Sequence, residues 1–127
     1  MDRVFLDASV LFAAGHRART SLERLWSLPG VTLLTSKGAA ERALRNLDSE
    51  ERRSRLVQLL ARVDIRPDPG SGELPATALG DAERRVLGAA TAARATHLLT
   101  GDTAGFGAAI GKAIGGVVVL RPSSYLS

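Results

Sequence analysis

Short apolar runs recur along this chain at intervals that are too long for β-hairpins. Their lengths and their content of Val, Leu, Ile and Thr predict buried strands at residues 3–6, 31–35, 63–66, 96–100 and 117–120. Between these runs, apolar residues recur with helical spacing at residues 22–26, 40–47, 56–63 and 86–93. Strands that alternate with helices indicate crossover connections around a parallel sheet. We therefore expect a three-layer α/β/α sandwich with a central parallel sheet of about five strands.

A chain of 127 residues has the size of one domain with its own core. The clearest loop contains Gly70 and Gly72 between prolines, and it is too short to link two domains. The apolar stretches are interrupted well before the roughly 20 residues that a membrane-spanning helix requires. The N-terminus also lacks the pattern of a secretion signal. We expect a single domain over residues 1–127, in the cytoplasm and not in a membrane.

The residue types leave few kinds of metal site open. The chain has no cysteine, which excludes thiolate zinc sites, thiol catalysis and disulfides. Its two histidines, His16 and His97, are far apart in the sequence, so oxygen ligands are the plentiful ones. The net charge is +4, and most of the 17 basic residues are arginine, whose guanidinium matches phosphate groups. This balance favours an anionic partner such as a nucleic acid.

Four acidic residues fall near one edge of the predicted sheet. In an open parallel sheet, ligands bind beyond the carboxyl ends of the strands. Asp7 directly follows the first predicted strand, and Asp102 lies just after the fourth. Asp81 begins the helix that leads into the fourth strand, and Glu41 lies in the helix that follows the second. We therefore expect the four carboxylates to share one cleft.

Each of these acids also has a purely structural explanation: Asp81 as a helix cap, Asp102 as a turn residue and Glu41 as part of a solvated helix face. Together, four carboxylates in one cleft would repel one another unless a cation lay between them. Mg²⁺ or Mn²⁺ prefers such oxygen ligands and, when bound, promotes phosphodiester hydrolysis. The hydroxyls of Ser9 and Thr100, beside Asp7 and Asp102, are candidates for orienting the ligands.

Several motifs of this chain resemble those of the PIN-domain family. They are Val-Phe-Leu-Asp-Ala-Ser-Val-Leu at residues 4–11, Glu-Arg-Ala-Leu at 41–44, Asp81 followed by Leu-Gly-Ala-Ala at 87–90, Thr-Gly-Asp at 100–102 with Phe106, and Leu-Arg-Pro-Ser-Ser-Tyr-Leu at 120–126. The match covers nearly the whole chain. In length and layout the chain is similar to the toxin ribonucleases of type II toxin-antitoxin pairs.

This resemblance implies a central parallel sheet and an endoribonuclease that depends on Mg²⁺ or Mn²⁺. It also implies a homodimer and, for toxin members, a small antitoxin protein that fills the groove of the active site. By motif, Asp7, Glu41, Asp81 and Asp102 correspond in this order to the four acids of the family. The resemblance thus assigns these four residues to catalysis and to the metal.

Two other classes remain open. A receiver or dehalogenase-like phosphotransfer domain also carries an aspartate after its first strand. The dehalogenase type needs a second aspartate at the position of Ser9. A receiver needs a phosphoacceptor aspartate after a central strand and a lysine late in the chain, whereas the third predicted strand here is followed by Pro67. A PIN-like module that binds RNA or a protein without cutting is the other alternative.

Arginines near the acids are the candidates for contact with RNA. Arg42 and Arg45 accompany Glu41, and Arg84 and Arg85 accompany Asp81. The alternative is that these arginines form ordinary exposed helix faces. With only one tryptophan, one tyrosine and three phenylalanines, the chain offers little for base stacking. Recognition through backbone charge and shape is therefore expected.

Overall fold

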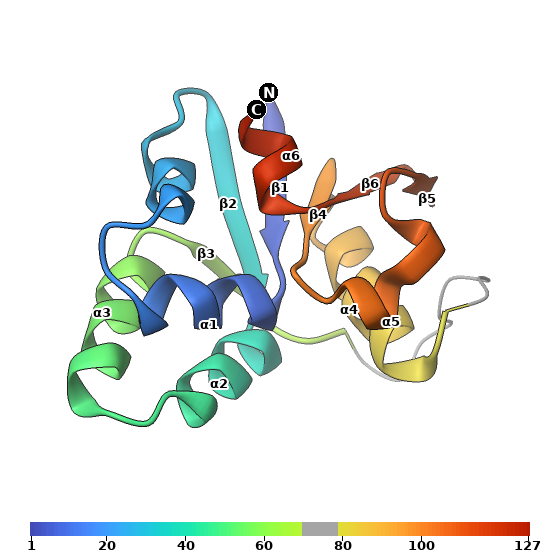
Figure 1. Cartoon of the computed structure of the whole chain (residues 1–127). Helices are drawn as coiled ribbons and strands as arrows, with labels where there is room; N and C mark the ends of the chain where they lie inside the picture. Colours follow the sequence, from blue (N-terminus) through green and yellow to red (C-terminus); the bar gives the residue numbers. More distant parts are fainter. Residues whose placement is uncertain (70–78) are drawn as a thin grey trace.

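A central β-sheet organises residues 1–69 and 79–127, which are the part of the chain that this computed structural model describes (Figure 1). Its strands lie in the order β3-β2-β1-β4-β6-β5. Every neighbouring pair is parallel except β5 and β6, which are antiparallel. The strands are β1 (Asp2–Leu6), β2 (Val31–Ser36), β3 (Asp64–Arg66), β4 (His97–Leu99), β5 (Ala113–Ile114) and β6 (Val117–Leu120).

Both faces of the sheet are apolar, because successive side chains of a strand point to opposite faces. In β1, Val4 and Leu6 pack into the core on one face, and Phe5 packs into the core on the other. Leu33 and Leu34 of β2 divide in the same way. A parallel sheet that is buried on both faces needs helices on both sides. The core therefore consists of two layers, with the sheet between them.

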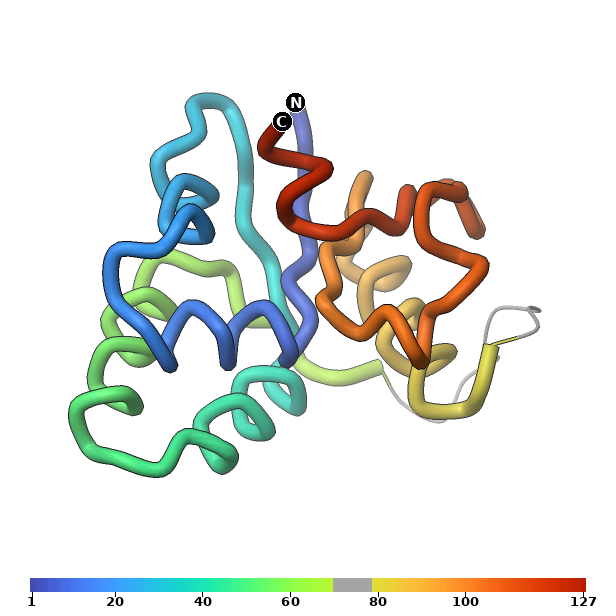
Figure 2. The backbone as a smooth tube through the Cα atoms, viewed as in Figure 1, coloured from blue at the N-terminus to red at the C-terminus, as the bar shows by residue number. Residues whose placement is uncertain are grey.

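The helices form two groups on opposite sides of the strands (Figures 1 and 2). Residues of α1 (Ala8–His16), the 3₁₀ helix η1 (Ser21–Ser27), α2 (Lys37–Asn46) and α3 (Glu50–Leu60) build one core layer, and the C-terminal α6 (Pro122–Leu126) packs against it. Residues of α4 (Asp81–Ala92), α5 (Thr103–Phe106) and η2 (Gly107–Ala109) build the other. The predicted three-layer α/β/α arrangement is confirmed.

The structure adds several elements to those that the sequence predicts. All the predicted strands form, but α1, β5, α5 and α6 were not predicted, and residues 21–27 form a 3₁₀ helix. No helix of the described residues is long and apolar enough to cross a membrane. The predicted loop at residues 70–72 lies outside the described residues.

The order of the strands creates a crevice at one edge of the sheet. From β1 the chain moves outward to β2 and β3, and it then returns to place β4 on the other side of β1. Connections on the two sides of β1 therefore diverge, and the carboxyl ends of β1 and β4 lie side by side between them. The segments that follow these two strands begin with Asp7 and Thr100.

Candidate active site

Asp7 is buried at the junction between β1 and α1, where the residue is 6% exposed. It is the N-cap of α1, and its Oδ1 accepts a hydrogen bond from the backbone N–H of Ala8 at 2.8 Å. Its Oδ2 accepts hydrogen bonds from Thr100 Oγ1 at 2.8 Å and from Ser9 Oγ at 3.1 Å. A buried carboxylate requires such partners, because burial without them is costly. The carboxylate of Asp7 is thus held in one orientation.

The two hydroxyls that hold Asp7 also connect it to the segment after β4. Thr100 Oγ1 accepts from the backbone N–H of Asp102 at 3.0 Å, and Ser9 Oγ accepts from the backbone N–H of Gly101 at 3.0 Å. Each hydroxyl therefore receives a hydrogen bond from a backbone N–H and donates its own hydrogen to Asp7. These contacts are the ones that an orienting role of Ser9 and Thr100 requires.

Asp102 and Glu83 approach each other from different elements. Asp102 is the N-cap of α5, and its Oδ1 accepts from the backbone N–H of Gly105 at 2.8 Å. A Cβ atom at Gly105 would overlap both Asp102 Oδ2 and Glu83 Oε1, so these two oxygens lie over the same glycine. Any side chain at position 105 would displace both carboxylates.

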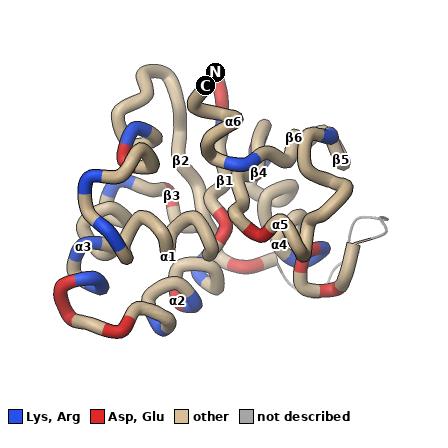
Figure 3. The backbone as a smooth tube through the Cα atoms, viewed as in Figure 1, with Lys and Arg blue, Asp and Glu red and all other residues tan. Residues whose placement is uncertain are grey.

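An open cavity of about 300 Å³ brings three carboxylates together at the crevice. Its lining includes Asp7, Glu83 and Asp102, from the ends of β1, α4 and β4, together with Arg42 from α2. Figure 3 shows acidic backbone segments where β1, α4 and α5 meet. No ion pair joins these three acids to any described basic residue within 4 Å. Among the described residues, the charge of each of these three acids is therefore not offset by a direct ion pair.

Two of the predicted acids lie outside this cavity. Glu41 is exposed on α2. Asp81 is the first residue of α4, its side chain is 77% exposed, and it forms an ion pair with Arg84 at 3.3 Å. Residues two positions apart lie about 200° apart around a helix, so the helix that turns Asp81 away brings Glu83 toward the cavity. Sequence reasoning missed Glu83, although its place in the same helical turn as Asp81 made it a candidate.

The carboxylates do not form a preassembled cage. Within the described residues there is no group of three His, Cys, Asp or Glu side chains close enough to hold one metal ion. Mg²⁺ commonly binds through only one or two carboxylates and keeps several water ligands. Asp102 Oδ2 and Glu83 Oε1, which lie over Gly105, could supply two such carboxylate ligands, with water as the other ligands and the carboxylate of Asp7 nearby.

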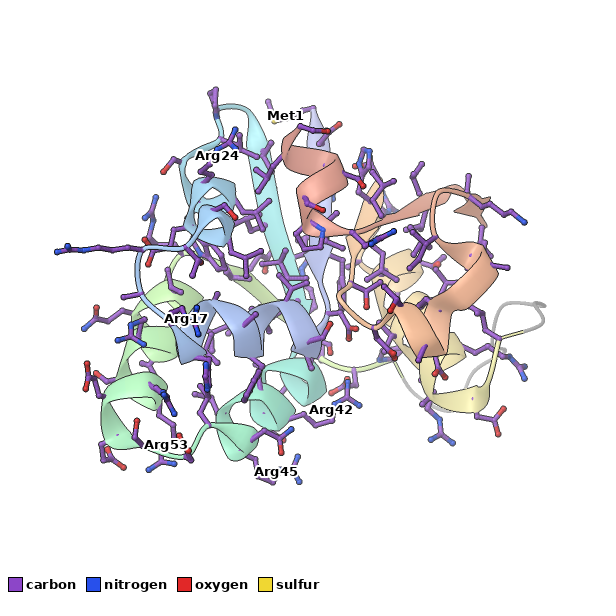
Figure 4. All side chains as sticks on the ribbon, viewed as in Figure 1. Met1, Arg17, Arg24, Arg42, Arg45 and Arg53 are labelled. Atoms are coloured by element: carbon purple, nitrogen blue, oxygen red, sulfur yellow. The ribbon has the colours of Figure 1, made fainter. Side chains whose placement is uncertain are left out.

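The predicted arginines are divided between the cavity and the surface. Arg42 extends from α2 and lines the cavity (Figure 4), and Arg85 lines a smaller cavity beside it. Arg45 is exposed on α2, and Arg84 pairs with Asp81. The basic run of α3 forms ion pairs with neighbouring acids, which is typical of a solvated helix face: Arg52 with Asp48, Arg53 with Glu50 and Arg55 with Glu51.

The arrangement of strands and helices in this chain is similar to that of two solved structures. The chain is similar to a chain of VapBC2 from Rickettsia felis, solved bound to a DNA fragment from its promoter, with a TM-score of 0.67 and 15% identity over 94% of this chain and 98% of that chain. It is also similar to Mycobacterium tuberculosis VapC20, a toxin that cleaves the sarcin-ricin loop, with a TM-score of 0.51 and 14% identity over 75% of this chain and 86% of that chain. The sequence significantly matches no protein-family model and no curated protein.

These similarities confirm the PIN-like fold that the sequence predicts, with its mostly parallel central sheet. At such low identity they establish the fold, and a fold alone does not determine an activity. The activity must therefore be argued from the site itself.

Proposed function

We propose that this chain is a metal-dependent endoribonuclease and the toxin of a type II toxin-antitoxin pair. The observation that carries the proposal is that Asp7, Glu83 and Asp102 line one open cavity at the carboxyl edge of the sheet. The three carboxylates form no ion pair with a described basic residue and could bind a cation. Arg42 in the same cavity could bind a phosphate. Phosphodiester hydrolysis is the reaction that uses both.

The metal that fits these residues is Mg²⁺ or Mn²⁺. Asp102 and Glu83 would hold it over Gly105, and Asp7 would contribute its charge from the end of β1. When bound, such an ion lowers the pKa of a water molecule and stabilises the charge that develops on the phosphate. We propose Glu83 in the role that the sequence motif gives to Asp81, whereas the predicted roles of Glu41 and Asp81 remain untested.

The chain's own residues have separate tasks in this proposal. Thr100 and Ser9 keep the carboxylate of Asp7 in place, so that it need not reorganise when substrate binds. Arg42 binds a non-bridging oxygen of the phosphate as a charged hydrogen-bond donor. A carboxylate oxygen that is not used as a ligand accepts a hydrogen bond from the attacking water and orients it.

The partners in this proposal follow from the resemblance. VapC20 is a toxin that cleaves the sarcin-ricin loop, and VapBC2 was solved bound to a DNA fragment from its promoter. By analogy, the substrate of this chain is RNA, and a small antitoxin protein covers its cavity and thereby blocks activity. We also propose that the chain forms a homodimer and acts in the cytoplasm.

One observation favours a second candidate function, that of a PIN-like module that binds without cutting. The described acids form no group of three that is close enough to ligate one ion. If substrate and metal together do not draw Asp7, Glu83 and Asp102 around an ion, the cavity would bind RNA or a protein without hydrolysis.

Cleavage of a labelled structured RNA by the purified chain distinguishes the two functions. The chain is incubated with Mn²⁺, with Mg²⁺ and with excess EDTA, and DNA of the same sequence serves as the control substrate. The proposal predicts internal cuts in RNA that require metal and disappear with EDTA. Binding of several RNAs without any cut would favour the non-cutting module, and cuts that persist in EDTA would exclude the metal.

A further inference from the structure

A second cavity of about 120 Å³ lies beside the acidic cavity. The two cavities share part of their lining, since Arg42 and Val86 contribute to both. The second cavity is completed by Ser36 at the start of α2 and by Arg85 of α4. The second cavity therefore adjoins the acidic cavity at Arg42 and Val86, with Arg85 in its lining.

Arg42 and Arg85 line the second cavity from two different helices, α2 and α4. Both side chains are exposed, and neither forms an ion pair or a hydrogen bond with another described side chain or with the described backbone. This separates them from the arginines of α3, whose charges are paired with neighbouring acids. Two unpaired guanidinium groups that line one small cavity favour an anionic group between them.

One acid, Asp68, also lines the second cavity. Its Oδ2 accepts a hydrogen bond from the backbone N–H of Gly38 at 2.9 Å, near the start of α2. Asp68 approaches so closely that a Cβ atom at Gly38 would lie 2.9 Å from its Oδ1. The backbone N–H groups at the start of a helix partly offset a negative charge placed there. The carboxylate of Asp68 is thus anchored, and its remaining charge reduces the attraction of the cavity for anions.

We propose that this second cavity binds a phosphate of the RNA backbone next to the one that is cut, through Arg85 and through Arg42, which lines both cavities and is shared between the two phosphates. The inference rests on the proposed nuclease function. It adds the path of the RNA strand, which leaves the acidic cavity and passes between α2 and α4. Asp68 limits the affinity of this subsite. Because phosphate contacts do not depend on the base, the subsite contributes affinity without sequence preference.

The test measures binding in EDTA, where the proposed cleavage does not occur. Fluorescence anisotropy of a short labelled single-stranded RNA gives Kd over a series of salt concentrations for wild type, Arg85→Gln, Arg42→Gln and Asp68→Asn. Arg17→Gln is the control, because Arg17 is equally cationic and exposed but lies at the far end of α1 from Asp7 (Figure 4). Asn at position 68 still offers an oxygen to the N–H of Gly38.

We expect Arg85→Gln and Arg42→Gln each to weaken binding about tenfold. The slope of log affinity against log salt should become shallower by about 0.7, the loss of one phosphate contact on a single strand. Asp68→Asn should tighten binding about threefold, since it removes a nearby negative charge. Arg17→Gln should leave Kd nearly unchanged.

Arg85→Gln that binds no worse than Arg17→Gln would overturn the subsite, as would an unchanged Kd for Asp68→Asn or a wild type that binds no RNA at low salt. Cleavage with Mn²⁺, measured on the same preparations, separates this failure from failure of the function. A chain that binds as expected but does not cut retains the subsite and loses the nuclease proposal. A chain that cuts RNA while Arg85→Gln binds normally retains the nuclease and loses the subsite.

Discussion

At the scale of single residues, Thr100 joins the two segments that form the site. Its hydroxyl is fully buried, donates to Asp7 Oδ2 and accepts from the N–H of Asp102. Removal of this hydroxyl would deprive both groups of a hydrogen-bond partner at a residue that is itself fully buried. An unsatisfied buried group typically costs about 1–3 kcal/mol.

Thr100→Val should therefore lower the free energy of unfolding by about 1–3 kcal/mol and reduce RNA cleavage. Thr100→Ser keeps the hydroxyl and should keep most of the cleavage activity, although it loses a buried methyl group. Urea unfolding and the cleavage rate with Mn²⁺ are measured for both variants. Equal activity of the two variants at matched folded fractions would mean that the hydroxyl does not position Asp7.

Glu83 and Asp81 lie in the same helical turn but have different surroundings. Glu83 lines the acidic cavity, and Asp81 is exposed beside Arg84. Glu83→Gln should reduce the cleavage rate at least about 100-fold, which corresponds to the loss of one group that stabilises the transition state. Asp81→Asn should change it by less than about threefold, the loss of a surface ion pair. If Asp81→Asn reduced the cleavage rate more than Glu83→Gln, Asp81 and not Glu83 would belong to the metal site.

The residues differed in how far the sequence could identify them. Asp7 and Asp102 follow buried strands. Because the carboxyl ends of parallel strands lie at the same edge of a sheet, residues that follow such strands can be placed at that edge from the sequence. Glu83 depends on the rotation of α4 about its own axis, which is set by packing against the sheet. The sequence pattern placed this helix correctly but did not determine which acid of its first turn faces the cavity.

At the scale of elements, α1 shows why one helix was not predicted. A surface helix is recognised by an apolar stripe that alternates with polar residues. In α1, Val10, Leu11, Ala14 and Gly15 are buried, because the helix packs with β1 on one side and with α2 and α3 on others. A Cβ atom at Gly15 would lie 2.9 Å from both Leu47 and Leu56, so the approach of α3 depends on this glycine.

The last helix, α6, is anchored at the end of the sheet opposite to the acidic cavity. Tyr125 donates a hydrogen bond to Asp2 Oδ2 at 2.7 Å, and its ring lies edge-on to His97 at 5.0 Å. Burial raises the pKa of Tyr125 from 10.0 to about 12, and the hydrogen bond to Asp2 adds to this effect. The neutral phenol is therefore favoured in the folded state.

This contact predicts a dependence of stability on alkaline pH. Because the folded pKa of Tyr125 is raised, its contribution is fully present below about pH 10 and is lost as the pH rises through about 12. Urea unfolding of wild type between pH 9 and 12 should show a decline that is steeper than that of Tyr125→Phe. Parallel curves for the two proteins would show that Tyr125 is not coupled to the fold in this way.

At the scale of the whole molecule, the site exists only when both helical layers are in place. Asp7 leaves the sheet toward α1, whereas Glu83 comes from α4 in the opposite layer. The alternation of strands and helices was sufficient to predict these layers, because the central strands β1, β2 and β4 are apolar on both faces. The two-residue β5 was beyond prediction, since its pairing with β6 depends on the turn between them and not on a hydrophobic pattern.

The central claim is that RNA is cut at the cavity that holds Asp7. The most direct test compares wild type with Asp7→Asn in one cleavage assay, with Mn²⁺ and with excess EDTA, after circular dichroism has shown that both are folded. The account predicts cuts by wild type only with metal and a loss of at least about 100-fold in Asp7→Asn. Cleavage by folded Asp7→Asn at the wild-type rate would contradict it.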